Sequence, residues 1–111
     1  FRFPGGSSNT GSSFNPGIMS RLSEKMQNMG YQYFDWNVLS GDAGETESTR
    51  QVYLNIINGC SQNNTNVVLQ HDIKNFSVDA VEDVILWGWN NGYTFLPLSY
   101  DSYTAHHSLN N

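Results

Sequence analysis

The stretch that decides the fold is Val67-Val68-Leu69-Gln70-His71-Asp72, in which three apolar residues lead into a histidine and an acid. A short apolar run of this kind is typical of a buried parallel strand. In α/β folds, ligands and catalytic side chains gather at the carboxyl ends of such strands. We therefore expect His71 to lie where a proton donor or a metal ligand would be useful, although a histidine in an exposed loop would give the same pattern.

The composition limits the class of protein. With 111 residues the chain is long enough for one small domain. A net charge of −5 with only five Lys and Arg residues argues against a nucleic-acid partner, because phosphate binding needs a basic surface. No apolar stretch is long enough to span a bilayer. The lone Cys60 falls in a helical pattern and is best interpreted as a small buried hydrophobic residue.

Strand-like and helix-like segments alternate along the chain. A helix is expected over about 16–29, with a stop at Gly30 and an apolar, methionine-rich face of Ile18, Met19, Leu22, Met26 and Met29. A second helix is expected from about Ser48 to Gly59, where Ser48 and Gln51 could form a capping box. A third is expected over about 78–90, with Ser77 as its N-cap and with Val78, Val81, Val84, Ile85 and Gly88 facing inward. Strands are expected at 31–38, 66–71 and 93–98, with Phe1–Phe3 as the end of a further strand, and residues 100–111 as a loosely held tail. The order βαβαβαβ predicts an α/β fold with a parallel sheet. It fits half of a (β/α) barrel or a small open sheet.

The predicted strands end in polar side chains. These are Arg2, the segment from Asp35 to Asp42, His71-Asp72, and the segment from Ser99 to Asp101. Because the carboxyl ends of parallel strands meet at one edge of a sheet, all of them would gather on one face. This convergence is the strongest physical indication of a site. His106-His107 invite a metal interpretation, but no third ligand lies near them in the sequence.

Three motifs carry a resemblance to a known family. The first resembles an Arg-x-Pro turn and consists of Phe1-Arg2-Phe3-Pro4-Gly5-Gly6. The second is an aromatic and acidic motif, Tyr33-Phe34-Asp35-Trp36-Asn37-Val38-Leu39-Ser40-Gly41-Asp42. The third resembles a Leu-x-His motif and consists of Val68-Leu69-Gln70-His71-Asp72. In this order and spacing they resemble the third, fourth and fifth motifs of the polysaccharide deacetylases of carbohydrate esterase family four, the NodB-homology domain. The resemblance covers residues 1–111 and corresponds to the C-terminal half of the deacetylase barrel.

The resemblance implies a function and roles for individual residues. Such proteins remove N-acetyl or O-acetyl groups from polysaccharides such as peptidoglycan or chitin, with the help of a divalent metal such as Zn²⁺. His71 would be the general acid that protonates the leaving amine, and Asp42 would be the second acid of the fourth motif. Leu69 would line the pocket for the acetyl methyl group, and Trp36 would form a flat wall for the sugar. Arg2 would pair with the catalytic base and hold it ionised.

The sequence departs from the family pattern at several positions. Gly5 stands where the family usually has Tyr, so that only its backbone N–H could help to bind an oxyanion. Leu39 stands where an aspartate is usual, and Asp35 is a candidate to replace that acid in tuning the general acid. Ala43 stands where a tryptophan often follows the second acid. Asp42 as a turn cap, Trp36 as ordinary core and Arg2 as a surface charge remain the structural alternatives.

The motifs that supply the catalytic base and the metal ligands in this family, Thr-Phe-Asp-Asp-Gly and His-x-x-x-His, do not occur in the 111 residues. We therefore expect no metal bound by this chain alone and no activity of these residues by themselves. The expected partners are the polysaccharide and either the missing N-terminal half of the domain or a second copy of the chain. The compartment implied by the resemblance is extracellular or the cell envelope. The alternative function is a non-catalytic α/β module that binds a glycan or a protein.

Overall fold

The computed structural model describes residues 1–110, which form two compact units. The first unit contains residues 1–36 and the segment from Ser99 onward, and the second unit contains Asn37–Leu98. The motifs are therefore divided, because the Arg-x-Pro turn lies in the first unit and the Leu-x-His motif in the second. No helix among residues 1–110 is long and apolar enough to cross a membrane.

The second unit is a small α/β structure around a two-stranded parallel sheet. It contains β1 (Val38–Leu39), α2 (Thr49–Ser61), β2 (Val68–Leu69), α3 (Asn75–Val78) and α4 (Val81–Asn90). In the sheet, Val38 is paired with Val68 and Leu39 with Leu69. The predicted α/β class and the parallel pairing of these two segments are thus confirmed.

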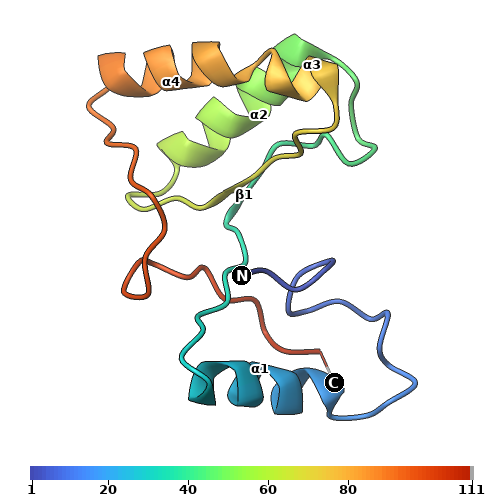
Figure 1. The fold of residues 1–111 in the computed structure, drawn as a ribbon. Helices are drawn as coiled ribbons and strands as arrows, with labels where there is room; N and C mark the ends of the chain where they lie inside the picture. Colours follow the sequence, from blue (N-terminus) through green and yellow to red (C-terminus); the bar gives the residue numbers. More distant parts are fainter. Residues whose placement is uncertain (111) are drawn as a thin grey trace. The chain divides into compact units, whose positions relative to one another are not determined.

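Helix α2 forms the centre of the second unit. It packs against β1, α3 and α4, and Figure 1 shows it next to α4. Val52 and Ile56, one helical turn apart, are fully buried in the core. Gly59 lets the helix approach the sheet, because a Cβ at this position would lie 2.7 Å from Cγ1 of Val38. The helix continues through Gly59 to Ser61, so the end predicted at Gly59 is wrong.

The start of α2 was predicted correctly. The Ser48 hydroxyl accepts a hydrogen bond from the backbone N–H of Gln51 at 3.2 Å, as an N-cap residue should. The return bond of a capping box is not formed, because the backbone N–H of Ser48 donates to Oγ1 of Thr46 at 3.0 Å. Of the two hydrogen bonds of a capping box, only the one accepted by the Ser48 hydroxyl is therefore present.

The helix predicted over 78–90 is divided into α3 and α4. Ser77 was predicted to be an N-cap, but it lies inside α3 and its side chain is fully buried. Val78 and Val81 were predicted to face inward and are instead exposed, while Gly88 is buried as predicted. The division changes the facing of these side chains because the two short helices do not share one continuous helical period.

In the first unit, α1 (Ile18–Asn28) begins two residues later than predicted. Its N-cap is Gly17, which has a positive φ of 79°, and the Asn15 side chain accepts a hydrogen bond from Arg21 instead of capping the helix. The predicted stop at Gly30 is confirmed, since this residue has a φ of 88° directly after the helix.

The buried face of α1 differs from the predicted methionine stripe. Met19 and Ser23 are buried, and Met26 is half-buried. Leu22 and Met29, which share the predicted apolar spacing, are exposed. The helix therefore buries a narrower face, centred on Met19, against Phe3 and Tyr33.

The strands predicted at 1–3, most of 31–38 and 93–98 do not form ladders among residues 1–110. The chain at 31–36 carries isolated bonds instead: the N–H of Phe34 donates to the Phe1 carbonyl, and that of Asp35 to the Thr104 carbonyl. A regular ladder needs a run of such partners. The predicted half barrel is therefore not shown by residues 1–110, in which the sheet consists of the two parallel strands β1 and β2.

The C-terminal segment is held more firmly than predicted. Ala105 is buried, and the His106 ring stacks on the ring of Tyr33 with the centroids 3.7 Å apart. The backbone of Thr104 accepts a hydrogen bond from Asp35, as described above. The loosely held tail predicted from its polar composition is thus wrong for residues 104–107.

Candidate active site

The second unit joins an acid and a histidine where its two strands end. Asp42 follows β1 by three residues and His71 follows β2 by two, so the parallel pairing brings both to the same edge of the sheet. The Nδ1 atom of His71 lies 2.8 Å from Oδ1 of Asp42. The backbone N–H of His71 donates to the other carboxylate oxygen, Oδ2, at 2.7 Å. Asp42 therefore holds both the ring and the backbone of the histidine.

Asp42 is itself fixed by a buried serine. The hydroxyl of Ser77, on α3, donates to Oδ2 of Asp42 at 2.5 Å, and only 1% of the Asp42 surface is exposed. Burial on its own raises the pKa of Asp42, but the hydrogen bonds from Ser77, His71 and Ser40 outweigh it and lower the pKa to about 2. Asp42 is thus ionised throughout the neutral range.

The ionised carboxylate determines which nitrogen of His71 carries the proton. A carboxylate only accepts hydrogen bonds, so Nδ1 of His71 must be the donor to Asp42. Nε2 then remains for proton exchange, and no hydrogen bond to it is present in the part of the chain that the structure describes. The His71 side chain is 33% exposed, so this nitrogen can be reached from solvent. The arrangement suits a general acid or base.

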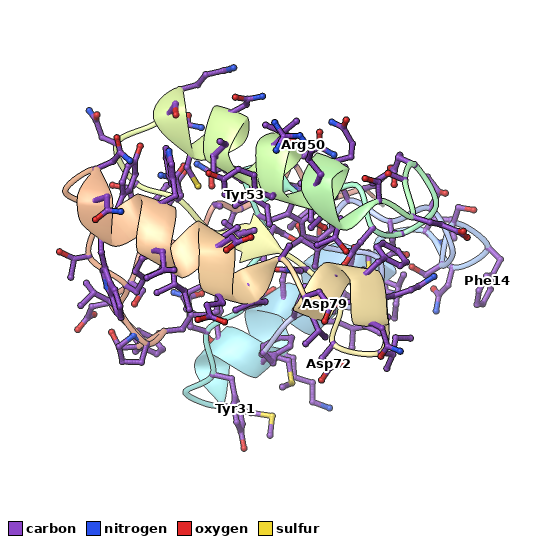
Figure 2. The ribbon with its side chains drawn as sticks, turned by 90° about the horizontal axis from the view of Figure 1, so that it is seen from above. Phe14, Tyr31, Arg50, Tyr53, Asp72 and Asp79 are labelled. Carbon is purple, nitrogen blue, oxygen red and sulfur yellow. The ribbon has the colours of Figure 1, made fainter. Side chains whose placement is uncertain are left out.

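Asp72, the acid next to His71 in the sequence, takes no part in this pair. It is exposed, and Figure 2 shows it beside α3 at the surface. The carboxylate that orients His71 is therefore the distant Asp42.

Leu69 occupies the end of β2, opposite Leu39. Its side chain is buried, with 9% of its surface exposed. Gln70, the next residue, donates to the backbone carbonyl of Ser77 at 2.6 Å and so ties the end of β2 to α3. Leu69 thus lies in the second unit, two residues before His71.

The other predicted site residues lie in the first unit. The carboxylate of Asp35 is 2% exposed and accepts three hydrogen bonds, from the hydroxyl and the N–H of Ser7 at 2.5 and 2.7 Å and from the N–H of His107 at 2.9 Å. Burial raises the pKa of Asp35, but these bonds and the nearby His107 ring give a net lowering. The carboxylate that contacts His71 is thus Asp42, whereas Asp35, the other candidate, bonds to Ser7 and His107.

Trp36 is half-buried and contacts two segments of the first unit, the N-terminal turn and the segment that contains His107. The Arg2 guanidinium lies over its ring, 5.9 Å from the centroid. A Cβ on Gly6 would come within 2.8 Å of the indole, and the His107 ring forms a T-shaped pair with it, with the ring centroids 4.6 Å apart. Arg2 forms no salt bridge within residues 1–110. Gly5, like Gly6, has a positive φ, so these glycines make the tight turn that the sequence predicted.

Sequence reasoning missed three residues that hold these acids in place: Ser77, Ser7 and His107. Ser77 stands between Phe76 and Val81, a local pattern that indicates an N-cap and hides its bond to Asp42, 35 residues away. Ser7 lies in a Gly- and Ser-rich loop in which no single serine is distinguished. His107 was considered only as a metal ligand, and nothing near it in the sequence indicates its bonds to Asp35 and Trp36.

The residues present do not form a metal site. Among residues 1–110 there is no group of three or more His, Cys, Asp or Glu side chains that could hold a metal ion. His106 and His107 each direct Nε2 at a backbone carbonyl, of Tyr33 and Trp36 respectively.

A parallel α/β unit that sets an Asp–His pair at its strand ends is a structure suited to hydrolysis. One solved structure matches the whole chain with 56% sequence identity and a TM-score of 0.94: the catalytic domain of peptidoglycan N-acetylglucosamine deacetylase from Eubacterium rectale ATCC 33656. No protein-family model matches the sequence, and no curated protein matches it. The similarity to the solved structure confirms the resemblance to the polysaccharide deacetylases that the motifs predicted. The chain spans about half of the matched structure, 51% of that structure's chain.

Proposed function

We propose that the chain forms part of a hydrolase that removes N-acetyl groups from a polysaccharide, with His71 as the general acid. The observation that carries the proposal is the hydrogen bond of 2.8 Å between His71 and the buried, ionised Asp42. The similarity to a peptidoglycan N-acetylglucosamine deacetylase supports it. It also favours peptidoglycan over chitin as the substrate, and N-acetyl over O-acetyl groups.

The proposed role of His71 is confined to the departure of the amine. When the tetrahedral intermediate collapses, the C–N bond breaks and its electron pair stays on the sugar nitrogen. That nitrogen takes a proton from Nε2 of the imidazolium, and acetate is released. Asp42 stabilises the imidazolium before this transfer and holds its Nδ1–H in place, so that Nε2 always points at the leaving group.

The remaining motif residues would bind the substrate. Leu69 would contact the acetyl methyl group, and Trp36 would offer a flat apolar face to the sugar ring. The backbone N–H of Gly5 would stabilise the oxyanion, and Arg2 would hold the catalytic base ionised. Asp35 would act indirectly, through the turn that carries Gly5.

We further propose that the complete site needs groups outside these 111 residues. The two motifs that would carry the base and the metal ligands do not occur in the sequence. A divalent metal such as zinc would be held there and would supply the Lewis acid that polarises the acetyl carbonyl. The 111 residues would then be inactive alone and would complete a (β/α) barrel with the remaining part of the domain. The protein would work outside the cell or in the cell envelope, where peptidoglycan lies.

The proposal is tested by measuring acetate release from N-acetylated peptidoglycan fragments by the protein in its longest natural form. We expect acetate and free amine to appear in equal amounts, and His71→Asn to lower both rates by about 10²–10⁴-fold. Parallel assays with O-acetylated fragments and with N-acetylglucosamine oligomers identify the preferred bond and polymer. A folded protein that binds the glycan but releases no acetate would overturn the proposed activity and favour the non-catalytic module.

A further inference from the structure

Two adjacent histidines attach the C-terminal segment to two different aromatic residues of the first unit. His106 directs Nε2 at the Tyr33 carbonyl at 2.8 Å and stacks its ring on the Tyr33 ring. His107 directs Nε2 at the Trp36 carbonyl at 2.7 Å, and its ring forms a T-shaped pair with the indole, with an angle of 76° between the two ring planes. The Nε2 atom of each histidine thus bonds to one backbone carbonyl, and each ring contacts one aromatic ring, but only His107 touches Trp36.

The contacts of His107 define its tautomer. A backbone carbonyl only accepts, so Nε2 must be the donor to Trp36. Nδ1 lies 3.2 Å from the hydroxyl of Ser8, which can donate to it. Both nitrogens of His107 are therefore occupied within the first unit, and the ring has a defined orientation.

The conformation of Ala105 indicates that these contacts decide the path of the segment. Ala105 has a φ of 49°, in the left-handed region that residues with a Cβ rarely adopt. It is also buried. Such a conformation persists only where the surrounding contacts impose it. The two histidines that follow Ala105 provide those contacts.

A single carboxylate connects this segment to the N-terminal turn. Asp35 accepts from the backbone of His107 and from both the N–H and the hydroxyl of Ser7. Ser7 follows Gly6, which packs against the Trp36 ring. His107 therefore bonds to the backbone carbonyl of Trp36 and also contacts its ring. Gly6 and Arg2 contact the ring as well.

We propose that His107 is a positioning residue for glycan binding. Together with Asp35, it holds the Trp36 indole in place as a preformed flat face for the sugar. This inference rests on the proposed function, in which Trp36 lines the substrate site. A side chain that is ordered before binding need not be ordered by the ligand, and this raises affinity. His107 itself need not touch the sugar.

The test compares His107→Ala with the neighbouring His106→Ala, its matched control, in the longest natural form of the protein. Both variants also carry His71→Asn, so that the glycan is not consumed. The probe is a tetramer of β-1,4-linked N-acetylglucosamine, and its Kd is measured by calorimetry. The indole N–H resonance of Trp36, assigned with Trp36→Phe, reports the position of the ring. A third variant, His107→Gln, keeps an N–H donor for the Trp36 carbonyl.

We expect His107→Ala to shift or broaden the Trp36 resonance and to weaken glycan binding about 10-fold, with partial recovery in His107→Gln. His106→Ala should lower the melting temperature by a similar amount but leave the Trp36 resonance and the Kd unchanged. An unchanged Trp36 resonance in His107→Ala, or equal weakening by both alanine variants, would overturn the inference. If the His71→Asn parent does not bind this glycan, the proposed function fails, and the Trp36 resonance still decides whether His107 positions the indole.

Discussion

His71 and Asp42 are 29 residues apart in the sequence, and their side chains meet at 2.8 Å beyond the ends of two parallel strands. Asp42 is almost fully buried and accepts hydrogen bonds from the ring and from the backbone of His71. The histidine is thereby held in one tautomer with Nε2 directed away from the acid. This relationship links the small α/β unit to the proposed acid catalysis.

Replacing Asp42 tests that link. In Asp42→Asn the negative charge that stabilises the imidazolium is lost, and the amide group places N–H donors where the carboxylate accepted bonds from Ser77 and His71. We expect kcat to fall by about 10²-fold with little change in KM, since general acid catalysis contributes this order of magnitude. Steady-state kinetics with an N-acetylglucosamine oligomer measures both constants.

The matched control for this variant is Asp72→Asn. It makes the same chemical change at the exposed acid next to His71, which lies outside the pair (Figure 2). It should retain the parent kinetics. A comparable fall in kcat in both variants would mean that net charge, and not the contact between Asp42 and His71, matters.

Ser77→Ala tests the support behind Asp42. The variant removes the donor at 2.5 Å from a buried, ionised oxygen, so the pKa of Asp42 should rise from about 2. A hydrogen bond to a charged group contributes about 1.5–3 kcal/mol, and we expect a loss of stability in this range. Urea unfolding measures this loss.

The matched control is Ser61→Ala, which removes a hydrogen bond of 2.7 Å to a neutral carbonyl on the exposed side of α2. It should lower the free energy of unfolding clearly less than Ser77→Ala does. Equal costs would contradict the special role of Ser77.

Stability should depend on acid in a defined window. Folding lowers the pKa of Asp42 to about 2 and lowers that of Asp35, whereas an unfolded aspartate titrates near about 3.9. Both groups therefore stabilise the folded state fully above the unfolded pKa, and this contribution is lost as the pH falls from about 4 toward 2. For Asp42 it amounts to about 2–3 kcal/mol.

Thermal unfolding between pH 2 and pH 6 measures this effect. The melting temperature should fall below about pH 4, and Asp42→Asn should make the curve flatter because it removes one of the two groups. A parallel fall in the parent and the variant would exclude Asp42 as a source of the pH dependence.

Gly6→Ala tests the packing of the N-terminal turn against Trp36. Gly6 has a φ of 83°, and a Cβ there would lie 2.8 Å from the indole and 3.2 Å from Oδ1 of Asp35. Gly30→Ala carries the same backbone strain, with a φ of 88°, but its Cβ meets no atom within 4 Å. Both variants should lose about 1 kcal/mol or more from strain, and Gly6→Ala should lose more because of the contact. Chemical denaturation of the two proteins gives the difference, and equal losses would contradict the packing.

Local patterns predicted the parts of the fold that depend on local chemistry. Ser48 caps α2 and Gly30 stops α1, because each acts on backbone groups within a few residues. The pairing of β1 with β2 also followed from the alternation of strands and helices. The segment 93–98 has the composition of a strand but no ladder partner among residues 1–110, and strand formation depends on that partner.

The candidate site shows the same limit. His71 and Asp42 could be selected because family motifs mark them, but nothing near Ser77 in the sequence indicates a bond to an acid 35 residues away. Likewise, the role of Asp35 depends on Ser7 and His107, which are 28 residues before it and 72 after it. Such pairings arise from tertiary packing, so local propensity carries no signal for them.

The measurement that tests the proposed role of His71 most directly compares two substrates that differ in their need for an acid. An N-acetylated sugar releases an amine that must be protonated, whereas 4-nitrophenyl acetate releases a stable phenolate. We predict that His71→Asn lowers kcat/KM by about 10²–10⁴-fold for the N-acetylglucosamine oligomer and by less than about 10-fold for the ester. Equal losses for both substrates, or no loss for the sugar, would contradict the assignment of His71 as the general acid.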